Sequence, residues 1–235
     1  MKTAILNYIT LNAWHPHGQK RLGESLKRQG FTGDYLIYNP HSLPCITHSE
    51  VPYAFKFFAI LDAIKKGYDR VLWLDASFWA VLNPDFLFDR IGEVGVLVQN
   101  SSYFMGQWSS DASLKHLGIS REDAWKIKMY SGGFMGFDLK NSKVLDFLAA
   151  VDVQILQKIG FQGAWTNKKQ EVSTDSAVRG HRHDMVVGSI LLERSGFPIQ
   201  ADNTLFSYYG WYEKYKNELD LKNVAFVCEG GMRKI

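Results

Sequence analysis

Short apolar runs alternate along this chain with longer segments in which apolar residues recur at helical spacing. The short runs predict strands at residues 3–10, 34–38, 70–74, 93–98, 129–138 and 224–228. The longer segments predict helices at residues 19–29, 52–66, 142–159 and 184–194. This alternation predicts an α/β fold in a single domain, with a central, mostly parallel mixed sheet flanked by helices.

Ligands of such sheets bind beyond the carboxyl ends of the strands. Functional residues are therefore expected directly after Tyr8 and Leu74, and in the loops before the later helices. The apolar run 70–74 is followed at once by Asp75, so an acid stands at that edge of the sheet. Such an acid either holds a metal ion or a nucleotide hydroxyl, or only caps a turn, and the strand alone leaves both interpretations open.

The composition is that of a folded globule, with 46% hydrophobic and 14% aromatic residues among 235. A formal net charge of +3 lacks the basic excess of nucleic-acid-binding proteins, so no nucleic-acid partner is expected. Cys45 and Cys228 stand far apart, which excludes a cysteine-based zinc site and indicates a reducing, cytoplasmic setting. Neither a transmembrane segment nor a secretory signal is expected.

Residues 53–84, YAFKFFAILDAIKKGYDRVLWLDASFWAVLNP, resemble the region around the Asp-x-Asp motif of GT-A-fold glycosyltransferases, which use nucleotide sugars. The matching tripeptide is Asp75-Ala76-Ser77, with serine in place of the second aspartate. The resemblance implies that Asp75 and Ser77 hold Mn²⁺ or Mg²⁺, which binds the diphosphate of the donor. A hydroxyl can ligate a metal but brings no charge, so the serine weakens the expected metal site.

Two further blocks support the resemblance. The segment SGGFMGFD at 131–138 is similar to the small-residue strand of the sugar pocket, which implies donor-sugar contacts at Ser131, Gly132 and Gly133. A bulged strand would also explain these glycines. Asp184, in GHRHD before a predicted helix, matches the place where inverting members carry a catalytic base, although an ordinary helix cap would look the same.

The resemblance also implies roles for residues outside these blocks. The nucleotide-binding residues that it implies are Thr10, Leu11, Asn12, Lys56, Asp75 and Ala76. Arg182 and His183 are expected to contact the donor sugar or its phosphates, and His183 or His181 would supply a third metal ligand. Lys56 would equally suit the solvated face of its helix.

Aromatic residues near the C-terminus are candidates for the acceptor side. Trp211 and Tyr212 are expected to stack on an acceptor sugar, flanked by Trp108 and Trp165. A core-capping cluster would use the same rings. The nucleotide-binding half is expected at residues 1–100 and the acceptor-side half at 101–235.

These features predict a metal-assisted glycosyltransferase that moves a sugar from a nucleotide-diphosphate sugar, by family frequency a UDP-sugar, to a glycan or other hydroxyl acceptor. With Asp184 as base the reaction would invert the anomeric centre, but the sequence leaves inversion and retention open. The compact chain is also similar to virus-encoded glycosyltransferases, which would place it in a host cytoplasm.

Two other classes stay open at this point. The serine at position 77 would also suit a nucleotide- or carbohydrate-binding relative that has lost its metal site and its activity. A nucleotidyltransferase would use a similar sheet and similar acids. Such enzymes carry a glycine-rich phosphate loop after the first strand, whereas residues 12–18 are poor in glycine, which counts against this class.

Overall fold

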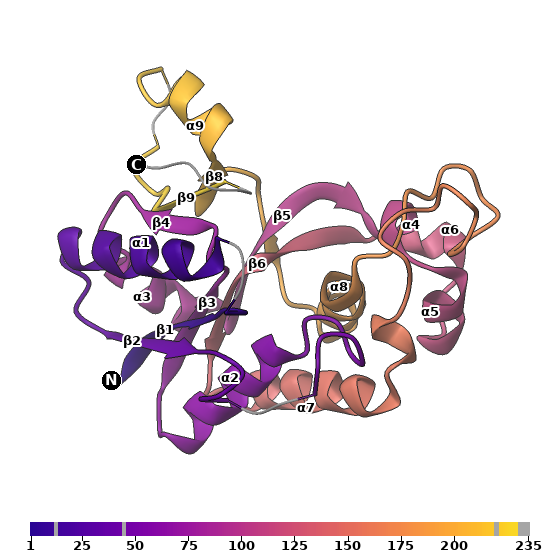
Figure 1. Cartoon of the computed structure of the whole chain (residues 1–235), viewed down its shortest axis with the longest axis horizontal. Helices are drawn as coiled ribbons and strands as arrows, with labels where there is room; N and C mark the ends of the chain where they lie inside the picture. Colours follow the sequence, from indigo (N-terminus) through magenta and orange to yellow (C-terminus); the bar gives the residue numbers. More distant parts are fainter. Residues whose placement is uncertain (12–13, 44–45, 219–220, 230–235) are drawn as a thin grey trace.

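The computed structural model describes residues 1–11, 14–43, 46–218 and 221–229; Cys45 lies outside these ranges. Its first half contains β1 Thr3–Tyr8, α1 His15–Arg28, β2 Asp34–Tyr38, α2 Phe55–Lys65, β3 Arg70–Leu74, β4 Phe78–Ala80, α3 Asp85–Val94, β5 Val96–Phe104, α4 Met105–Trp108 and α5 Asp111–His116. Its second half contains α6 Arg121–Ala124, β6 Lys128–Asp138, α7 Ser142–Gln157, the short 3₁₀ helix η1 Ile159–Phe161, α8 His183–Ser195, β7 Ile199–Gln200, β8 Phe206–Tyr208, α9 Tyr209–Tyr215 and β9 Phe226–Cys228 (Figure 1). None of these helices is long and apolar enough to cross a membrane.

A six-stranded mixed sheet forms the centre, in the order β2-β1-β3-β6-β5-β7. The pairs β1–β2, β1–β3 and β5–β7 are parallel, whereas β6 runs antiparallel to both β3 and β5. The expected α/β fold with a mostly parallel mixed sheet is therefore confirmed. The apolar strand β3 lies in the interior of the sheet, so Asp75 emerges at its carboxyl edge beside the end of β1.

Helices cover both faces of this sheet (Figure 1). Alternate side chains of a strand point to opposite faces, so neighbours such as Ile5 and Leu6 belong to different cores. On the face of Ile5, the sheet packs against α1, α3 and a second, three-stranded sheet of order β4-β9-β8. On the face of Leu6, it packs against α2, α7 and α8.

The elements differ from the predicted ones in the middle and at the end of the chain. Residues 93–94, expected to open a strand, close α3, because Leu87, Phe88 and Ile91 form a buried helical face there. The strand that follows, β5, begins at Val96 and runs on to Phe104. The helix α3 was not predicted, although it has ten residues. The short elements α4, α5, α6, η1, α9, β4, β7 and β8 were not predicted either, since each is too short to show a clear period.

Candidate active site

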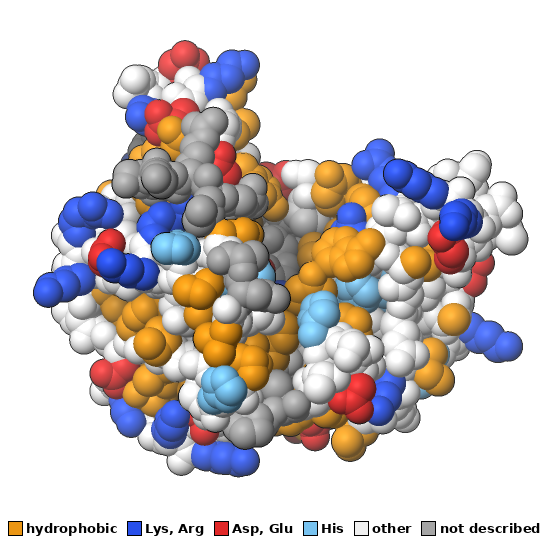
Figure 2. All heavy atoms as spheres, in the orientation of Figure 1, with side chains coloured by type: hydrophobic (Ala, Val, Ile, Leu, Met, Phe, Trp, Pro, Cys, Tyr) orange, Lys and Arg blue, Asp and Glu red, His pale blue; other side chains and the backbone are white. Residues whose placement is uncertain are grey.

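Two neighbouring cavities open beyond the carboxyl ends of β1 and β3. One, of about 380 Å³, is lined by Tyr53, Lys56, Asp75, Ser77, Phe78, Ser101, Tyr103, Trp108, Met129, Ser131, Gly132, Gly133, Trp165, Arg182, His183, Asp184, Met185, Tyr208 and Cys228. The other, of about 460 Å³, is lined by Tyr8, Ile9, Thr10, Trp14, His15, His48, Tyr53, Phe55, Asp75, Ala76 and Ser77. Figure 2 shows a hollow in the middle of one face, with hydrophobic and His side chains gathered around it. Because Tyr53, Asp75 and Ser77 line both cavities, the two form one continuous site.

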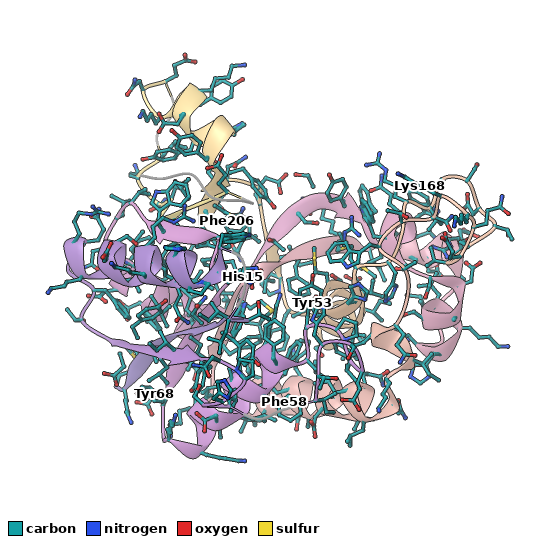
Figure 3. The ribbon with its side chains drawn as sticks, viewed as in Figure 1. His15, Tyr53, Phe58, Tyr68, Lys168 and Phe206 are labelled. Atoms are coloured by element: carbon teal, nitrogen blue, oxygen red, sulfur yellow. The ribbon has the colours of Figure 1, made fainter. Side chains whose placement is uncertain are left out.

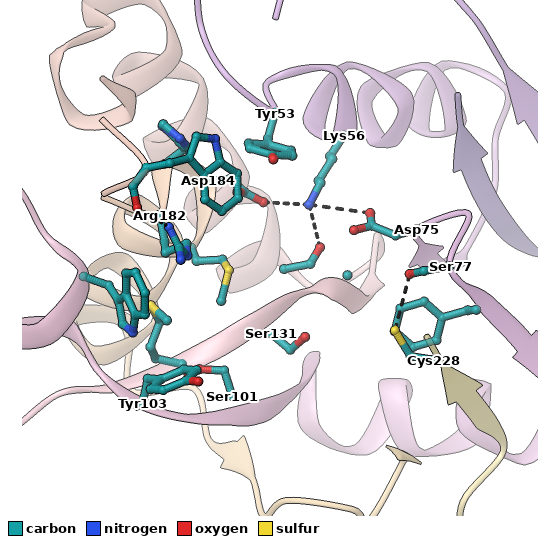
Figure 4. A pocket seen from close by; sticks show the side chains of 18 of the residues that line it. Tyr53, Lys56, Asp75, Ser77, Ser101, Tyr103, Ser131, Arg182, Asp184 and Cys228 are labelled. Carbon is teal, nitrogen blue, oxygen red and sulfur yellow. Dashed lines mark hydrogen bonds and ion pairs between the residues drawn. The ribbon is translucent and has the colours of Figure 1, made fainter. Parts of the chain in front are cut away.

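The ammonium group of Lys56 lies at the centre of the first cavity (Figure 4). Its Nζ donates to Asp184 Oδ2 at 2.9 Å and to the Gly132 carbonyl at 2.8 Å, and lies 3.6 Å from Asp75 Oδ1. The side chains of Lys56 and Asp184 are each only 3% exposed, whereas Asp75 is 38% exposed. A buried cation thus connects two acids that are distant in sequence, and only Asp75 opens widely to solvent.

Both members of the buried pair lie in the first turn of a helix, Lys56 in α2 and Asp184 in α8. A carboxylate is favoured at a helix N-terminus, but a cation is disfavoured there. The position of Lys56 is therefore explained by its partners and not by its helix. Gly188 lets α8 lie close to Tyr130 of β6, and this contact holds Asp184 above Gly132.

Burial and pairing shift the titration of the site. Burial would lower the pKa of Lys56, but the charges of Asp184 and Asp75 outweigh it and raise that pKa above its ordinary value. Burial raises the pKa of Asp184, with the charge of Lys56 acting in the opposite direction. Burial also raises the pKa of Tyr53 to about 12, with a smaller contribution from the charge of Asp184. Lys56 therefore stays charged at neutral pH, and Asp184 is a stronger proton acceptor than an exposed aspartate.

The two glycines of β6 leave space for this cluster. A Cβ at position 132 would lie 2.7 Å from Asp184 Oδ2 and 3.3 Å from Lys56 Nζ. A Cβ at position 133 would lie 3.2 Å from Asp75 Oδ2. The pairing of β6 with β5 shifts register between Met135 and Tyr130, so Gly132 and Gly133 lie in an irregular, bulged stretch of the strand as well as at the close approach of these side chains.

Two residues of the cavity wall have left-handed backbones. Tyr53 has φ 65° and His183 has φ 38°, values that are uncommon for residues with a side chain. Tyr53 lies two residues before the start of α2. Its N–H donates to His48 Nδ1 at 3.2 Å, and its ring centroid lies 4.9 Å from Lys56 Nζ. Backbone strain of this kind is concentrated at functional sites, which supports the assignment of this cavity.

The second cavity is suited to a flat ring. Tyr8 and Phe55 stack with centroids 4.6 Å apart, and Thr10 Oγ1 lies 2.5 Å from His15 Nδ1. Figure 3 shows His15 and Tyr53 on either side of the middle of the molecule, and both line this cavity. Aromatic walls with a few polar atoms are typical of sites that bind a nucleobase and ribose.

The residues expected to hold a metal form a sparse donor set. Asp75 Oδ1 accepts from the Trp73 indole at 2.8 Å, and Ser77 Oγ lies 3.3 Å from Cys228 Sγ. Among the described residues, no group of three or more His, Cys, Asp and Glu side chains is placed to hold a metal ion. One open carboxylate and one hydroxyl fit Mg²⁺ or Mn²⁺ only where phosphate oxygens and water complete the shell, which is how such ions are commonly bound.

His183 lines the first cavity, whereas His181 is buried and lines neither cavity. His183 Nδ1 is 2.8 Å from the Phe161 carbonyl, and its ring contacts Tyr53 and Trp165. His181 is fully buried, and its Nδ1 accepts from the Ser110 N–H at 3.2 Å. Burial lowers the pKa of His181 to about 3, with the neighbouring His183 as a smaller cause. Each imidazole is therefore engaged through Nδ1, while the Nε2 atoms of both are buried without a hydrogen-bond partner among the described residues.

Comparisons with known proteins identify the fold. No family model and no curated protein sequence matches the chain. The structure of WbbM, a bifunctional glycosyltransferase, superposes with a TM-score of 0.56 at 11% identity, over 99% of this chain and 46% of WbbM. A glycosyltransferase involved in glycosylation of the major capsid of PBCV-1 gives 0.55 at 13% identity, over 97% of this chain and 93% of that one. Mouse xyloside xylosyltransferase 1 gives 0.54 at 12% identity, over 98% of each chain.

The chain has a GT-A glycosyltransferase fold. This confirms the fold that the Asp75 block and the two later blocks suggested. The chain spans less than half the length of WbbM, so it corresponds to one part of that bifunctional protein.

The structure brings together most of the residues singled out from the sequence. Lys56, Asp75, Ala76, Ser77, Ser131, Gly132, Gly133, Arg182, His183 and Asp184 all line the joined cavities, as do Thr10, Trp108 and Trp165. Leu11 is 54% exposed and lines neither cavity, and Asn12 lies outside the described residues. Trp211 and Tyr212 lie on α9, which projects from the body in Figure 1, and Trp211 packs on Tyr215.

Several wall residues were missed by the sequence analysis. Tyr208, the residue just before α9, lines the cavity in place of Trp211 and Tyr212. Tyr103 enters from the end of β5, and Cys228 from the end of β9. Tyr53 begins the block that resembles glycosyltransferases, so its position was a usable signal. Nothing local marks the others, because β8 and β9 reach the site only through the second sheet.

Proposed function

We propose that this chain transfers a glycosyl group from a nucleotide-diphosphate sugar, with UDP-sugar as the leading candidate, to a hydroxyl of a glycan or glycoconjugate. The observation that carries the proposal is the cluster of Lys56, Asp184, Asp75 and Gly132 at the edge of a GT-A sheet. The nucleoside is assigned to the cavity of Tyr8, Phe55 and Thr10, and the sugar to the cavity of Gly132 and Asp184.

The position of Asp75 supports a role at the diphosphate, because its carboxylate lies where the two cavities meet. Asp75 and Ser77 would hold Mn²⁺ or Mg²⁺ together with phosphate oxygens, and such an ion would neutralise charge on the leaving group. The buried ammonium of Lys56 orients Asp184 and adds a fixed positive charge near the sugar.

Asp184 is proposed as the general base. An acceptor hydroxyl attacks the anomeric carbon and forms the new C–O bond, while the bond to the β-phosphate oxygen breaks and the nucleoside diphosphate leaves. The hydroxyl proton passes to the Asp184 carboxylate, whose pKa is raised by burial, as suits a base near neutral pH. A single displacement of this kind inverts the anomeric centre.

The variant Asp184→Asn tests this assignment. It preserves the shape of the side chain and removes the proton acceptor, so donor affinity should stay within about threefold while transfer falls by about 10²-fold or more. Calorimetry with the nucleoside diphosphate and a transfer assay separate the two effects. The matched control is Asp146→Asn, an exposed aspartate on α7. Transfer at a near-normal rate, or a product anomer of retained configuration by NMR, contradicts the base role of Asp184.

A catalytically inactive binding relative is the second candidate, and the serine at position 77 favours it. It predicts that nucleotides bind while no donor is turned over. The variant Asp75→Ala tests whether Asp75 takes part in binding the diphosphate. We expect it to abolish Mn²⁺-dependent nucleotide binding, and an unchanged nucleotide affinity contradicts a role of Asp75 in holding the metal ion and the diphosphate.

A further inference from the structure

Arg182, Trp108, Trp165 and Tyr103 line one wall of the sugar cavity, and Arg179, which lines neither cavity, lies beside them. The Arg182 guanidinium lies between two indoles, 3.6 Å from the ring centroid of Trp108 and 4.2 Å from that of Trp165. The Arg179 guanidinium lies 6.0 Å from the ring centroid of Trp108 and 5.8 Å from that of Tyr103. Figure 4 shows Arg182 and Tyr103 at this wall.

The backbone holds both arginines firmly. The Arg179 N–H donates to the Gln107 carbonyl at 2.8 Å, and the Arg182 N–H donates to the Trp108 carbonyl at 3.1 Å. One arm of Arg182 donates to the Trp165 carbonyl at 3.0 Å. A guanidinium stacked between rings and tied by one nitrogen is pre-oriented, so little entropy is lost when its other nitrogens bind a ligand.

Neither guanidinium is neutralised by an acid. Within residues 1–11, 14–43, 46–218 and 221–229, no carboxylate lies within ion-pair distance of Arg179 or Arg182. Arg179 is exposed, Arg182 is half-buried, and Tyr103 and Trp165 beside them are 38% and 49% exposed. Within the described part of the chain, Arg182 in the cavity wall and Arg179 beside it are thus two cations without an acidic partner, next to partly exposed aromatic rings.

Arg182 lies apart from the residues proposed to hold the donor phosphates. Asp75 and Ser77 border the nucleotide cavity, whereas Arg182 lines only the sugar cavity. In Figure 4, Arg182 and Tyr103 lie on the opposite side of the view from Ser77 and Cys228, with Lys56 and Ser131 between them. A donor that fills the nucleotide cavity and places its sugar at Gly132 therefore does not occupy the wall around Arg182, which stays open for the acceptor.

We infer that the acceptor is an acidic glycan, and that Arg179 and Arg182 bind its anionic group while Tyr103 and Trp165 support its sugar rings. This inference rests on the proposed function, because it names the acceptor of the same site. Guanidinium groups bind carboxylate or sulfate through paired N–H donors, and aromatic rings stack on the apolar faces of sugars. Carboxylate and sulfate share this chemistry, so the experiment includes both.

The test measures acceptor binding by calorimetry without donor. Three matched disaccharides are compared, ending in glucuronate, in a sulfated glucose and in plain glucose. Wild type is expected to bind one acidic disaccharide about tenfold or more tightly than the neutral one, with a preference that shrinks as salt is added. The acidic disaccharide that binds more tightly shows whether the site recognises a carboxylate or a sulfate.

The variants Arg179→Gln and Arg182→Gln should each remove most of this preference, whereas affinity for the neutral disaccharide changes little in Arg179→Gln. Arg28→Gln, an exposed arginine at the end of α1, is the control and should keep the preference. Arg179 is exposed, so its variant is expected to fold even where Arg182→Gln does not.

Equal affinity for acidic and neutral disaccharides, or a preference that survives in Arg179→Gln, overturns the inference. A preference lost equally in Arg28→Gln also overturns it, because that result indicates non-specific attraction. Donor turnover is scored separately. A preference for acidic disaccharides without any donor turnover supports the acidic-glycan site and contradicts the proposed function. Donor turnover without that preference supports the proposed function and contradicts the acidic-glycan site.

Discussion

Single side chains decide the chemistry of this site, and Lys56 is the most consequential. Replacing it with Met leaves Asp184 charged and buried without its partner, so the free energy of unfolding should fall by about 3–5 kcal/mol. The double variant Lys56→Met with Asp184→Asn removes both charges and should recover much of that loss. Urea unfolding measures all three proteins. The control is Lys65→Met on the exposed end of α2, expected within about 0.5 kcal/mol of wild type. If the free energy of unfolding falls as little for Lys56→Met as for the control, the result contradicts the expectation that the buried pair of Lys56 and Asp184 contributes to stability.

His181 gives the fold a defined sensitivity to acid. Its pKa is lowered to about 3 by burial, whereas in the unfolded chain it titrates near its ordinary value of 6.5. Between these two values the unfolded state binds the extra proton, so stability falls as the pH falls. From about pH 7 to about pH 5 the loss from this residue should be about 2 kcal/mol.

The variant His181→Gln tests this expectation, since glutamine does not titrate. The difference in unfolding free energy between the two pH values should be smaller in the variant by that amount. An equal difference in both proteins shows that His181 does not carry the acid sensitivity.

At the level of residues, the sequence predicted a position correctly where the information lies in neighbouring residues. Asp75 follows an apolar strand at once, so its edge position could be read from adjacent residues. The partners of Lys56 lie 76 and 128 positions away, and its place on α2 fits a solvated face as well as a buried one. Its burial becomes evident only when β6 and α8 are packed together.

Among the elements, β6 is the one on which the site most depends. Gly132→Ala places a methyl group against the Asp184 carboxylate and beside the Lys56 ammonium, and should reduce transfer about 10²-fold by displacing them. Gly210→Ala in α9 is the control, because a Cβ there meets nothing within 4 Å. Transfer kinetics of the two variants are compared with wild type. Near-normal transfer in Gly132→Ala contradicts the close packing of this cluster.

Most of the longer elements were predicted correctly, apart from the ten-residue helix α3, and most of the short ones were missed. The strands around residues 3–8, 34–38 and 70–74 and the helices around 142–157 and 183–195 could be recognised from their patterns. The strands β4 and β8 have three residues each and are held by pairing with β9, which no local pattern reveals. The acceptor platform was predicted at Trp211 and Tyr212, whereas rings that line the cavity wall come from β5, α4, β8 and the loops before α2 and α8.

The molecule as a whole combines a GT-A fold with few oxygen donors for a metal ion and a buried lysine. The sheet places Asp75, Gly132 and Asp184 at one edge, and the two cavities would hold the nucleoside and the sugar of the proposed donor. The stacked arginines then give the far end of the site a positive charge that the near-neutral composition does not reveal.

Release of nucleoside diphosphate from a panel of sugar nucleotides, with Mn²⁺ and with a chelator, is the most direct test of glycosyl transfer at this site. Wild type is expected to release the diphosphate from one donor, faster with Mn²⁺, and Asp75→Ala is expected to release none above background. A wild-type protein that binds nucleotide and releases no diphosphate from any donor contradicts the proposed transferase.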